Sequence, residues 1–220
     1  MSIDLYISKY SGPSRAVWMT VKQLKLSVNI KHIDLSEGQQ LAPEFVKINP
    51  SHTVPTIVDN GFALWESRAI LQYLCNQYAP DSSLYPKDTK KRAIVERWLN
   101  QDFSLGYHQR DVLYPTLMGA PVAEDKVTAY KNALKVIDGL IGTNKYLTGN
   151  DLTIADLSLL AAAVPHDWLP AFDLSDVPNF NRWYNQLKGE LSYFDEVNNI
   201  PKEQLNAMVE KYKAKFAPKA

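Results

Sequence analysis

The sequence predicts two domains, an α/β domain with a mixed four-stranded sheet followed by an all-helical domain. Two observations indicate the first domain: apolar residues alternate in several short runs before residue 66, and helical spacing appears between and after these runs. A third observation indicates the second domain, since segments beyond residue 88 show helical spacing and no convincing strand. The 220 residues accommodate two domains, each of about 80 to 130 residues.

The first domain has the predicted order β-α-β-α-β-β-α. Its first strand is the alternating run at 3–7. Pro13 then favours a helix that runs to about Leu26, because the missing N–H of proline costs nothing in a first helical turn. A second strand at 29–35 completes a βαβ unit with a right-handed crossover. A short helix is expected at 43–48.

A hairpin and a helix complete this domain. Asn60-Gly61 joins the apolar runs 56–59 and 62–65, and this dipeptide is the strongest short-range hairpin signal. The last helix is expected to begin at Glu66-Ser67. Its buried face follows helical spacing and consists of Ile70, Leu71, Leu74, Cys75 and Tyr78.

A polar segment bounded by two prolines separates the domains. We place the first domain at 1–80, the linker at 81–87 and the all-helical domain at 88–220. The expected helices of the second domain lie at about 88–118, 123–142, 154–169, 178–189 and 201–216. Thr153 and Asp156 have the spacing of a capping box at the start of the third of these helices.

Composition excludes several classes of function. The 24 Lys and Arg residues balance the 24 Asp and Glu residues, so we expect neither nucleic acid nor a membrane surface as a partner. Cys75 is the single cysteine, which excludes a disulfide within the chain, and we expect no metal site. Charges within residues 1–15 are unlike a signal peptide, and no apolar run reaches membrane-spanning length. We therefore expect a cytoplasmic protein.

The stretch Ser11-Gly12-Pro13-Ser14-Arg15 is the first candidate site. It lies between a strand and a helix N-terminus, where backbone N–H groups and the helix dipole favour an anion. A hydroxyl at this point can donate a hydrogen bond to a thiolate. The alternative is that Ser11 or Ser14 only caps the helix.

Three further candidates lie around the hairpin. Pro55 precedes a strand, and a cis Val54–Pro55 bond would leave the backbone of Val54 free to pair with an extended peptide. The alternative is an ordinary proline at the start of a strand. Glu66 and Ser67 can together hold the ammonium and carboxylate of an α-amino acid, or can simply cap the helix. His52 can hold a carboxylate, or can be an ordinary loop histidine.

Taken together, these segments resemble the cytosolic glutathione transferases, and most closely the insect delta/epsilon type. The resemblance covers essentially the whole chain, and its most diagnostic feature is the Glu66-Ser67 step after Val54-Pro55. The stretches that carry it are 11–15, 41–45, 48–56, 59–70, 85–86 and 152–156. It implies a thioredoxin-like first domain and a helical second domain, with glutathione as co-substrate.

The resemblance also implies roles for individual residues. Ser11 would donate a hydrogen bond to the glutathione sulfur and act as the catalytic residue. Delta-type relatives often carry a histidine in the loop before residue 41, where this chain has Gln39-Gln40. The residues expected to bind glutathione are Gln40, His52, Val54, Pro55, Glu66, Ser67 and Arg68.

The resemblance implies a homodimer that conjugates glutathione to a hydrophobic electrophile, a reaction of the detoxification type. The expected electrophile pocket combines one helix of the second domain with the C-terminal helix. Its candidates are Tyr107, Arg110, Asp111, Tyr114, Leu117, Tyr212 and Phe216, although helical stripes of aromatic residues are more often core than pocket. Alternatives on the same fold are a carrier with little turnover and a glutathione-dependent peroxidase or isomerase. A structural or translation-associated module is disfavoured, because Ser11, Glu66 and Ser67 are all retained.

Overall fold

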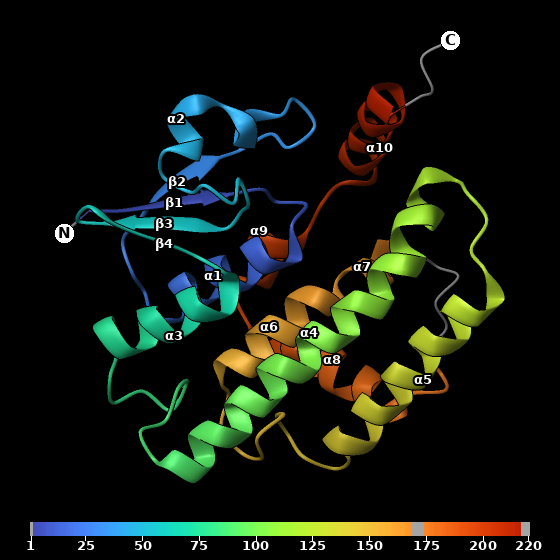
Figure 1. The fold of residues 1–220 in the computed structure, drawn as a ribbon. Helices are drawn as coiled ribbons and strands as arrows, with labels where there is room; N and C mark the ends of the chain where they lie inside the picture. Colours follow the sequence, from blue (N-terminus) through green and yellow to red (C-terminus); the bar gives the residue numbers. More distant parts are fainter. Residues whose placement is uncertain (1, 169–173, 217–220) are drawn as a thin grey trace. The chain divides into compact units, whose positions relative to one another are not determined.

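The computed structural model describes residues 2–168 and 174–216, and it contains one mixed sheet (Figure 1). The strands are β1 (Ile3–Ile7), β2 (Asn29–His32), β3 (Thr56–Asp59) and β4 (Phe62–Trp65). Their order in the sheet is β2-β1-β3-β4. β1 pairs parallel with β2 and antiparallel with β3, which pairs antiparallel with β4. The predicted mixed four-stranded sheet and its Asn-Gly hairpin are confirmed.

Helices cover both faces of this sheet (Figure 1). Figure 1 shows α1 (Gly12–Gln23) and α3 (Ser67–Tyr78) on one side and α2 (Pro43–Val46) on the other. The alternation of β1 explains this arrangement, because one set of its side chains, Ile3, Leu5 and Ile7, is fully buried. Tyr6 points to the opposite face and packs edge-on against Phe45 of α2, with ring centroids 5.6 Å apart.

Three predicted elements of the first domain are longer than the observed ones, and one of them is the short helix expected at 43–48, which ends at Val46. The strand expected at 29–35 ends at His32, because its partner β1 ends at Ile7; the last contact is the Ile33 N–H to the Ile7 carbonyl, 2.8 Å. The helix expected to reach Leu26 ends at Gln23. Lys25 then adopts a positive φ of 54°, which is incompatible with a right-handed helix.

The second half of the chain is helical. Its helices are α4 (Thr89–Met118), α5 (Glu124–Ile141), α6 (Ile154–Ala163), α7 (Pro165–Trp168), α8 (Pro178–Glu190), α9 (Phe194–Asn198) and α10 (Lys202–Phe216). Within the described ranges no strand follows residue 88, as predicted; Tyr146 and Gly149 form only an isolated bridge. The single helix expected at 154–169 is divided before Pro165, which lacks the N–H that an uninterrupted helix needs, and residue 169 lies outside the described residues.

The predicted capping box at the start of α6 is confirmed. Asp156 accepts hydrogen bonds from the N–H and the hydroxyl of Thr153, each 2.9 Å away. The other carboxylate oxygen accepts from the Leu147 N–H at 2.8 Å and from the indole N–H of Trp183 at 3.1 Å. Asp156 is completely buried, so this one side chain links the start of α6 to the preceding loop and to α8.

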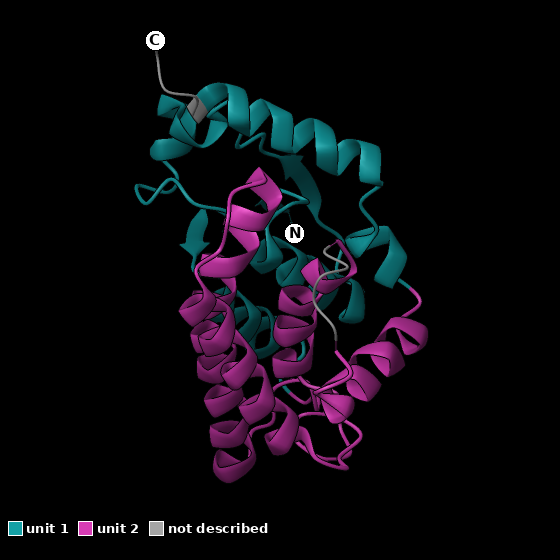
Figure 2. Ribbon diagram, turned by 90° about the vertical axis from the view of Figure 1, so that its right-hand side faces the viewer, with its two compact units in different colours: residues 1–80, 193–220 teal, residues 81–192 magenta. Residues whose placement is uncertain are grey.

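The chain divides into two compact units, drawn in different colours in Figure 2. Unit 1 contains residues 1–80 and 193–220, and unit 2 contains residues 81–192. The first unit therefore includes α9 and α10, whereas the sequence analysis assigned all of 88–220 to the second domain. Two contacts explain the difference: the Tyr193 hydroxyl donates to Gln23 of α1 at 2.6 Å, and the Asn198 amide contacts the Met19 sulfur of α1 at 3.3 Å.

Candidate active site

The register of the sheet brings four loop segments of unit 1 to one edge. Ile7 lies opposite His32 in a parallel pair, so the chain leaves β1 and β2 at the same edge. Tyr6 lies opposite Thr56 and Thr56 lies opposite Trp65, so β3 begins and β4 ends at that edge. The segments gathered there are 8–11, 33–41, 49–55 and 66–68. All the residues that the sequence analysis assigned to glutathione binding or catalysis lie within these segments.

Ser11 occupies the N-cap of α1. Its side-chain oxygen accepts a hydrogen bond from the Ser14 N–H at 3.3 Å, and its extended backbone has φ −87° and ψ 116°. Ser11 is half-buried, so its hydroxyl remains within reach of a ligand. The capping oxygen acts as the acceptor in this contact. The hydroxyl hydrogen is therefore free to be donated to a different group.

The neighbouring hydroxyls have other partners. Ser14 is completely buried, and its oxygen accepts from the Ser8 N–H at 3.3 Å. The Tyr6 hydroxyl accepts from Lys31 at 3.3 Å. The Tyr10 hydroxyl donates to the carbonyl of Gln204 at 3.2 Å. Ser11 is the one hydroxyl of this group that combines partial exposure with a position at the N-terminus of α1.

A buried asparagine organises the segment before β3. The Asn49 amide donates to the Thr53 carbonyl at 3.0 Å and to the Thr56 hydroxyl at 2.9 Å, and its oxygen accepts from the Ser51 N–H at 2.9 Å. Asn49 is completely buried, and the sequence analysis did not single it out. The available signal was its position in Asn49-Pro50, a dipeptide typical of turns.

The Val54–Pro55 peptide bond is cis, as predicted from the sequence. Pro55 is buried and Val54 is half-buried. Within the described residues, neither the N–H nor the C=O of Val54 has a hydrogen-bond partner. His52 lies two residues earlier, is exposed and has a positive φ of 45°.

The junction of β4 and α3 has an unusual backbone. Glu66 is the N-cap of α3 with φ 68° and ψ 106°, a conformation that costs a residue with a side chain about 1–3 kcal/mol. Its side chain is exposed and makes no capping hydrogen bond. Ser67 begins the helix and is buried, while Arg68 is half-buried. No partner of the Glu66 carboxylate is found among the described residues, so this strained corner presents it beside a helix N-terminus, an arrangement suited to an α-amino acid group.

Gln40 lies in the short 3₁₀ helix η1 (Gln39–Leu41) that follows the loop after β2. Its side-chain oxygen is shielded from solvent and has no hydrogen-bond partner among the described residues. Within residues 2–168 and 174–216, no group of three or more His, Cys, Asp or Glu side chains could hold a metal ion.

Comparison with known proteins shows the family of the chain. Residues 5–82 match the family model of the glutathione S-transferase N-terminal domain, and residues 111–189 match that of the C-terminal domain. A delta-class glutathione transferase from Nilaparvata lugens is 42% identical in sequence and has a TM-score of 0.85, with 96% of this chain and 99% of that chain covered. This chain belongs to the glutathione S-transferase family.

Other insect glutathione transferases have similar structures. The Bombyx mori glutathione transferase BmGSTD1, in a complex with GTT, is 33% identical with a TM-score of 0.88, covering 94% of this chain and 98% of that one. An epsilon-class enzyme from Musca domestica is 31% identical with a TM-score of 0.83, covering 96% and 98%. The predicted resemblance to the delta/epsilon type is confirmed, as is the thioredoxin-like first domain. The protein is a glutathione transferase, and glutathione is its co-substrate.

The residues predicted to line the electrophile pocket are divided between the units. Tyr107, Arg110, Asp111, Tyr114 and Leu117 all lie on α4 in unit 2, and Tyr212 lies on α10 in unit 1. Tyr107 and Tyr114 are exposed to 58% and 49% of their residue surface, which is unlike core residues. The Asp111 carboxylate pairs with the Lys126 ammonium at 3.1 Å. The side chain of Phe216 lies outside the described part of the structure. The pocket as a whole stays a prediction.

No helix in the described ranges is long and apolar enough to cross a membrane.

Proposed function

We propose that this glutathione transferase conjugates the glutathione thiolate to apolar electrophiles, and that the Ser11 hydroxyl stabilises the thiolate. One observation carries the proposal: the sheet register gathers the N-cap of α1, the unpaired backbone of Val54 and the free Glu66 carboxylate at one edge. These groups match the thiol, the peptide backbone and the α-amino acid end of one extended tripeptide.

The energetic demand on Ser11 is modest. A free thiol has a pKa near ~8.5, so only a small fraction is ionised at neutral pH. Lowering this pKa by about two units requires about 2.7 kcal/mol of preferential stabilisation of the thiolate. One hydrogen bond to an anion supplies about 1.5–3 kcal/mol, and a helix N-terminus adds about 0.3–1 kcal/mol. Ser11 at the start of α1 provides both contributions without acting as a base.

The remaining contacts would hold the parts of glutathione that do not react. Glu66 would accept from the γ-glutamyl ammonium, and Ser67 at the start of α3 would donate to its carboxylate, with Arg68 nearby. Val54, which precedes Pro55, would pair its backbone with the cysteinyl unit. His52 and Gln40 would contact the glycyl carboxylate, which lies at the opposite end of the tripeptide.

The electrophile pocket would be lined by the α4 residues Tyr107, Arg110, Asp111, Tyr114 and Leu117. The exposed rings of Tyr107 and Tyr114 support this assignment, because large apolar surfaces that face solvent often mark a binding site.

We further propose a cytoplasmic homodimer. Family membership supports this assembly, and two-fold pairing is the commonest closed symmetry of soluble proteins. A net charge of zero presents no general electrostatic obstacle to association. Light scattering at micromolar protein concentration is expected to give twice the chain mass of 24.9 kDa. A monomer mass would contradict the dimer.

A substrate panel tests the proposed reaction. The protein is incubated with a dinitrohalobenzene, an organic hydroperoxide and an isomerisable dienone or ketone, each with and without glutathione. We expect glutathione-dependent conjugation of the halobenzene, seen as aryl-thioether formation. Retention on immobilised glutathione with no turnover would favour the carrier alternative, and turnover of the hydroperoxide or isomer alone would favour the other two activities.

A further inference from the structure

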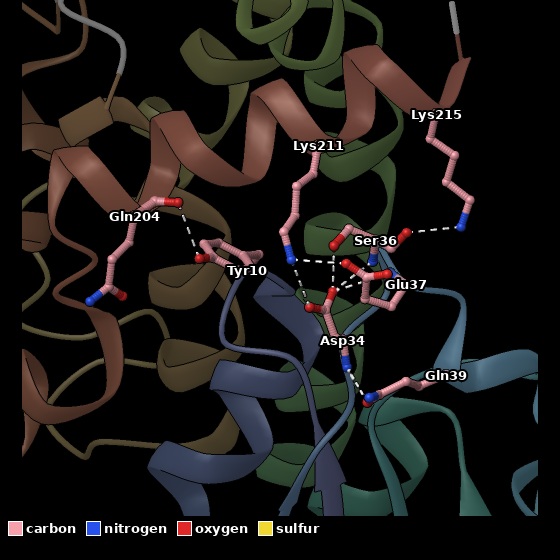
Figure 3. Close-up of polar contacts among 8 residues, drawn as sticks. All are labelled: Tyr10, Asp34, Ser36, Glu37, Gln39, Gln204, Lys211 and Lys215. Atoms are coloured by element: carbon pink, nitrogen blue, oxygen red, sulfur yellow. Dashed lines mark hydrogen bonds and ion pairs between the residues drawn. The ribbon is translucent and has the colours of Figure 1, made fainter.

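Helix α10 contacts two separate turns of unit 1 (Figure 3). Near its start, the Gln204 carbonyl accepts from the Tyr10 hydroxyl at 3.2 Å, and the Gln204 side-chain oxygen accepts from the ammonium of Lys9. About two and three helical turns later, Lys211 and Lys215 reach the loop that follows β2. The same helix therefore touches the turn before Ser11 and the loop before Gln40.

The loop after β2 is organised around Asp34. One oxygen of its carboxylate accepts from the N–H and the hydroxyl of Ser36, at 2.9 and 2.5 Å, and from the Glu37 N–H at 3.3 Å. The hydrogen bond from Ser36 is the main reason that the pKa of Asp34 lies below its usual range. The Asp34 N–H in turn donates to the side chain of Gln39 at 2.8 Å, so this loop is directly connected to η1 and Gln40.

Two lysine ammonium groups of α10 contact this loop. The Lys211 ammonium lies 2.9 Å from the carboxylate of Glu37 and 3.5 Å from the second carboxylate oxygen of Asp34. The Lys215 ammonium donates to the Ser36 carbonyl at 2.9 Å. Figure 3 shows both lysines pointing from one face of α10 toward the loop. We name this set of contacts, Lys211 and Lys215 with Asp34, Ser36 and Glu37, the α10 clasp.

The two ends of α10 contact loops that leave neighbouring parallel strands. The turn at Tyr10 follows β1, and the clasped loop follows β2. Between Gln204 and Lys211 the helix rises by about 10 Å, and a hydrogen-bonded helix does not stretch. A helix fixed at both points therefore sets the separation of the two loops.

We propose that α10 is a positioning element for glutathione, and that the clasp holds the 34–41 loop where Gln40 meets the glycyl end while Ser11 meets the sulfur. This inference rests on the proposed function of Ser11 and Gln40. Lys211 and Lys215 are positioning residues, since they act through the loop and not on the substrate. The clasp side chains are about half exposed, so their contribution is moderate and is screened by salt.

The first test removes the clasp cations in the full-length protein. In the double variant Lys211→Gln/Lys215→Gln we expect the KM for glutathione to rise about three- to tenfold, because three moderate contacts are lost. The kcat is expected to change by less than about twofold, since the reacting groups are untouched. In about 1 M salt the wild-type KM is expected to approach that of the variant. The conservative Lys211→Arg variant is expected to retain the wild-type KM.

Lys213→Gln is the matched control. Lys213 lies on the same helix between the two clasp lysines, and it pairs within the helix with Glu210 at 2.9 Å. The substitution removes one positive charge from the same helix, half the change of the double variant, without removing a clasp contact. We expect an unchanged KM for glutathione in this variant.

A charge swap tests the partner assignment. Lys211→Glu and Glu37→Lys each place like charges together and are expected to raise the KM for glutathione. The double variant restores an opposite-charge pair, so its KM is expected to be lower than that of either single variant. If the KM increase of the double variant equals the sum of the two single effects in free energy, Lys211 and Glu37 do not interact, and the assigned pair is wrong.

Amide hydrogen exchange of residues 34–41 supplies a readout that needs no activity. Exchange is expected to accelerate in Lys211→Gln/Lys215→Gln and to stay unchanged in Lys213→Gln. If the wild-type protein fails to bind glutathione, the proposed function is wrong. In that case the clasp is tested by hydrogen exchange alone, and unchanged exchange of residues 34–41 in Lys211→Gln/Lys215→Gln would show that the clasp does not hold the loop. If wild-type protein binds glutathione but the clasp variant keeps its KM, the positioning role is wrong whatever the exchange shows.

Discussion

The side-chain oxygen of Ser11 accepts a hydrogen bond from the backbone N–H of Ser14, 3.3 Å away, while the hydroxyl of Ser14 is itself completely buried. The two serines of the Ser-Gly-Pro-Ser stretch thus have different surroundings. Ser11 caps α1 and stays within reach of a ligand. The Ser14 hydroxyl oxygen accepts a hydrogen bond from the Ser8 N–H and so stabilises the turn after β1.

Removal of the Ser14 hydroxyl should affect stability and leave the chemistry intact. Ser14→Ala leaves the Ser8 N–H without its acceptor, and we expect the free energy of unfolding to fall by about 1–3 kcal/mol. The pH–rate profile of the folded variant should match that of wild type. Urea unfolding and the profile together check this, and a shifted profile would mean that Ser14 interacts with the thiolate.

Glu66 is expected to strengthen glutathione binding while its positive φ lowers the stability of the folded protein. Glu66→Ala and Glu66→Gly both remove the carboxylate, so each should raise the KM for glutathione about tenfold with little change in kcat. The positive φ of 68° favours glycine, so Glu66→Gly should be more stable than Glu66→Ala by about 1 kcal/mol. Steady-state kinetics and urea unfolding measure the two effects. Equal wild-type KM values in both variants would remove Glu66 from the site.

Ser67→Ala tests the same end of glutathione from the helix side. Its hydroxyl is lost but the N–H at the start of α3 remains, so we expect a rise in KM for glutathione that is smaller than for Glu66→Ala. The kcat should again change little. Isothermal titration with glutathione provides the direct comparison, and a larger effect at Ser67 would reverse the assigned importance of the two residues.

Asn49 is expected to position the 52–55 segment. Asn49→Ala leaves the Ser51 N–H without its acceptor and removes one of two hydrogen bonds to the Thr53 carbonyl, which keeps the one from the Thr56 hydroxyl. We expect the free energy of unfolding to fall by about 2 kcal/mol. The KM for glutathione should rise in the folded variant, because Val54 lies within the same segment. The exposed helical Asn185 is the control, and Asn185→Ala should change stability by no more than about 0.5 kcal/mol.

Cys75 should take no part in the thiol chemistry. Burial raises the pKa of its thiol to about 12, so the native protein should resist iodoacetamide at pH 8 and react only when unfolded. Because the folded pKa is the higher one, the stability that the neutral thiol contributes is present below pH ~9 and is lost as the pH rises toward about 12. Cys75→Ala should retain conjugation. Loss of activity on alkylation of native protein would contradict this view.

Local signals account for most of what the sequence predicted. The Asn60-Gly61 hairpin, the start of α3 at Ser67 and the Thr153–Asp156 capping box depend on neighbouring residues, and all three are observed. The sheet register was not predicted and comes from the structure. It determines the edge at which the candidate residues meet.

The features that were missed depend on contacts between distant parts of the chain. Helix α9 spans only five residues, too few for a clear period, and its position depends on Asn198 meeting Met19. The packing of α10 against the loop after β2 joins residues more than 170 positions apart. Asn49 was missed because its role depends on complete burial, which a single turn residue does not reveal.

The most direct test of the central claim is the pH–rate profile of Ser11→Ala beside Ser11→Thr, Tyr6→Phe, Tyr10→Phe and Ser14→Ala. Loss of one hydrogen bond to the thiolate should raise the pKa of bound glutathione by about one to two units. The kcat/KM of Ser11→Ala should therefore fall about 10- to 100-fold at neutral pH and far less at pH 9, with Ser11→Thr close to wild type. A wild-type profile for Ser11→Ala, with a shifted profile in one of the other variants, would contradict the assignment of Ser11.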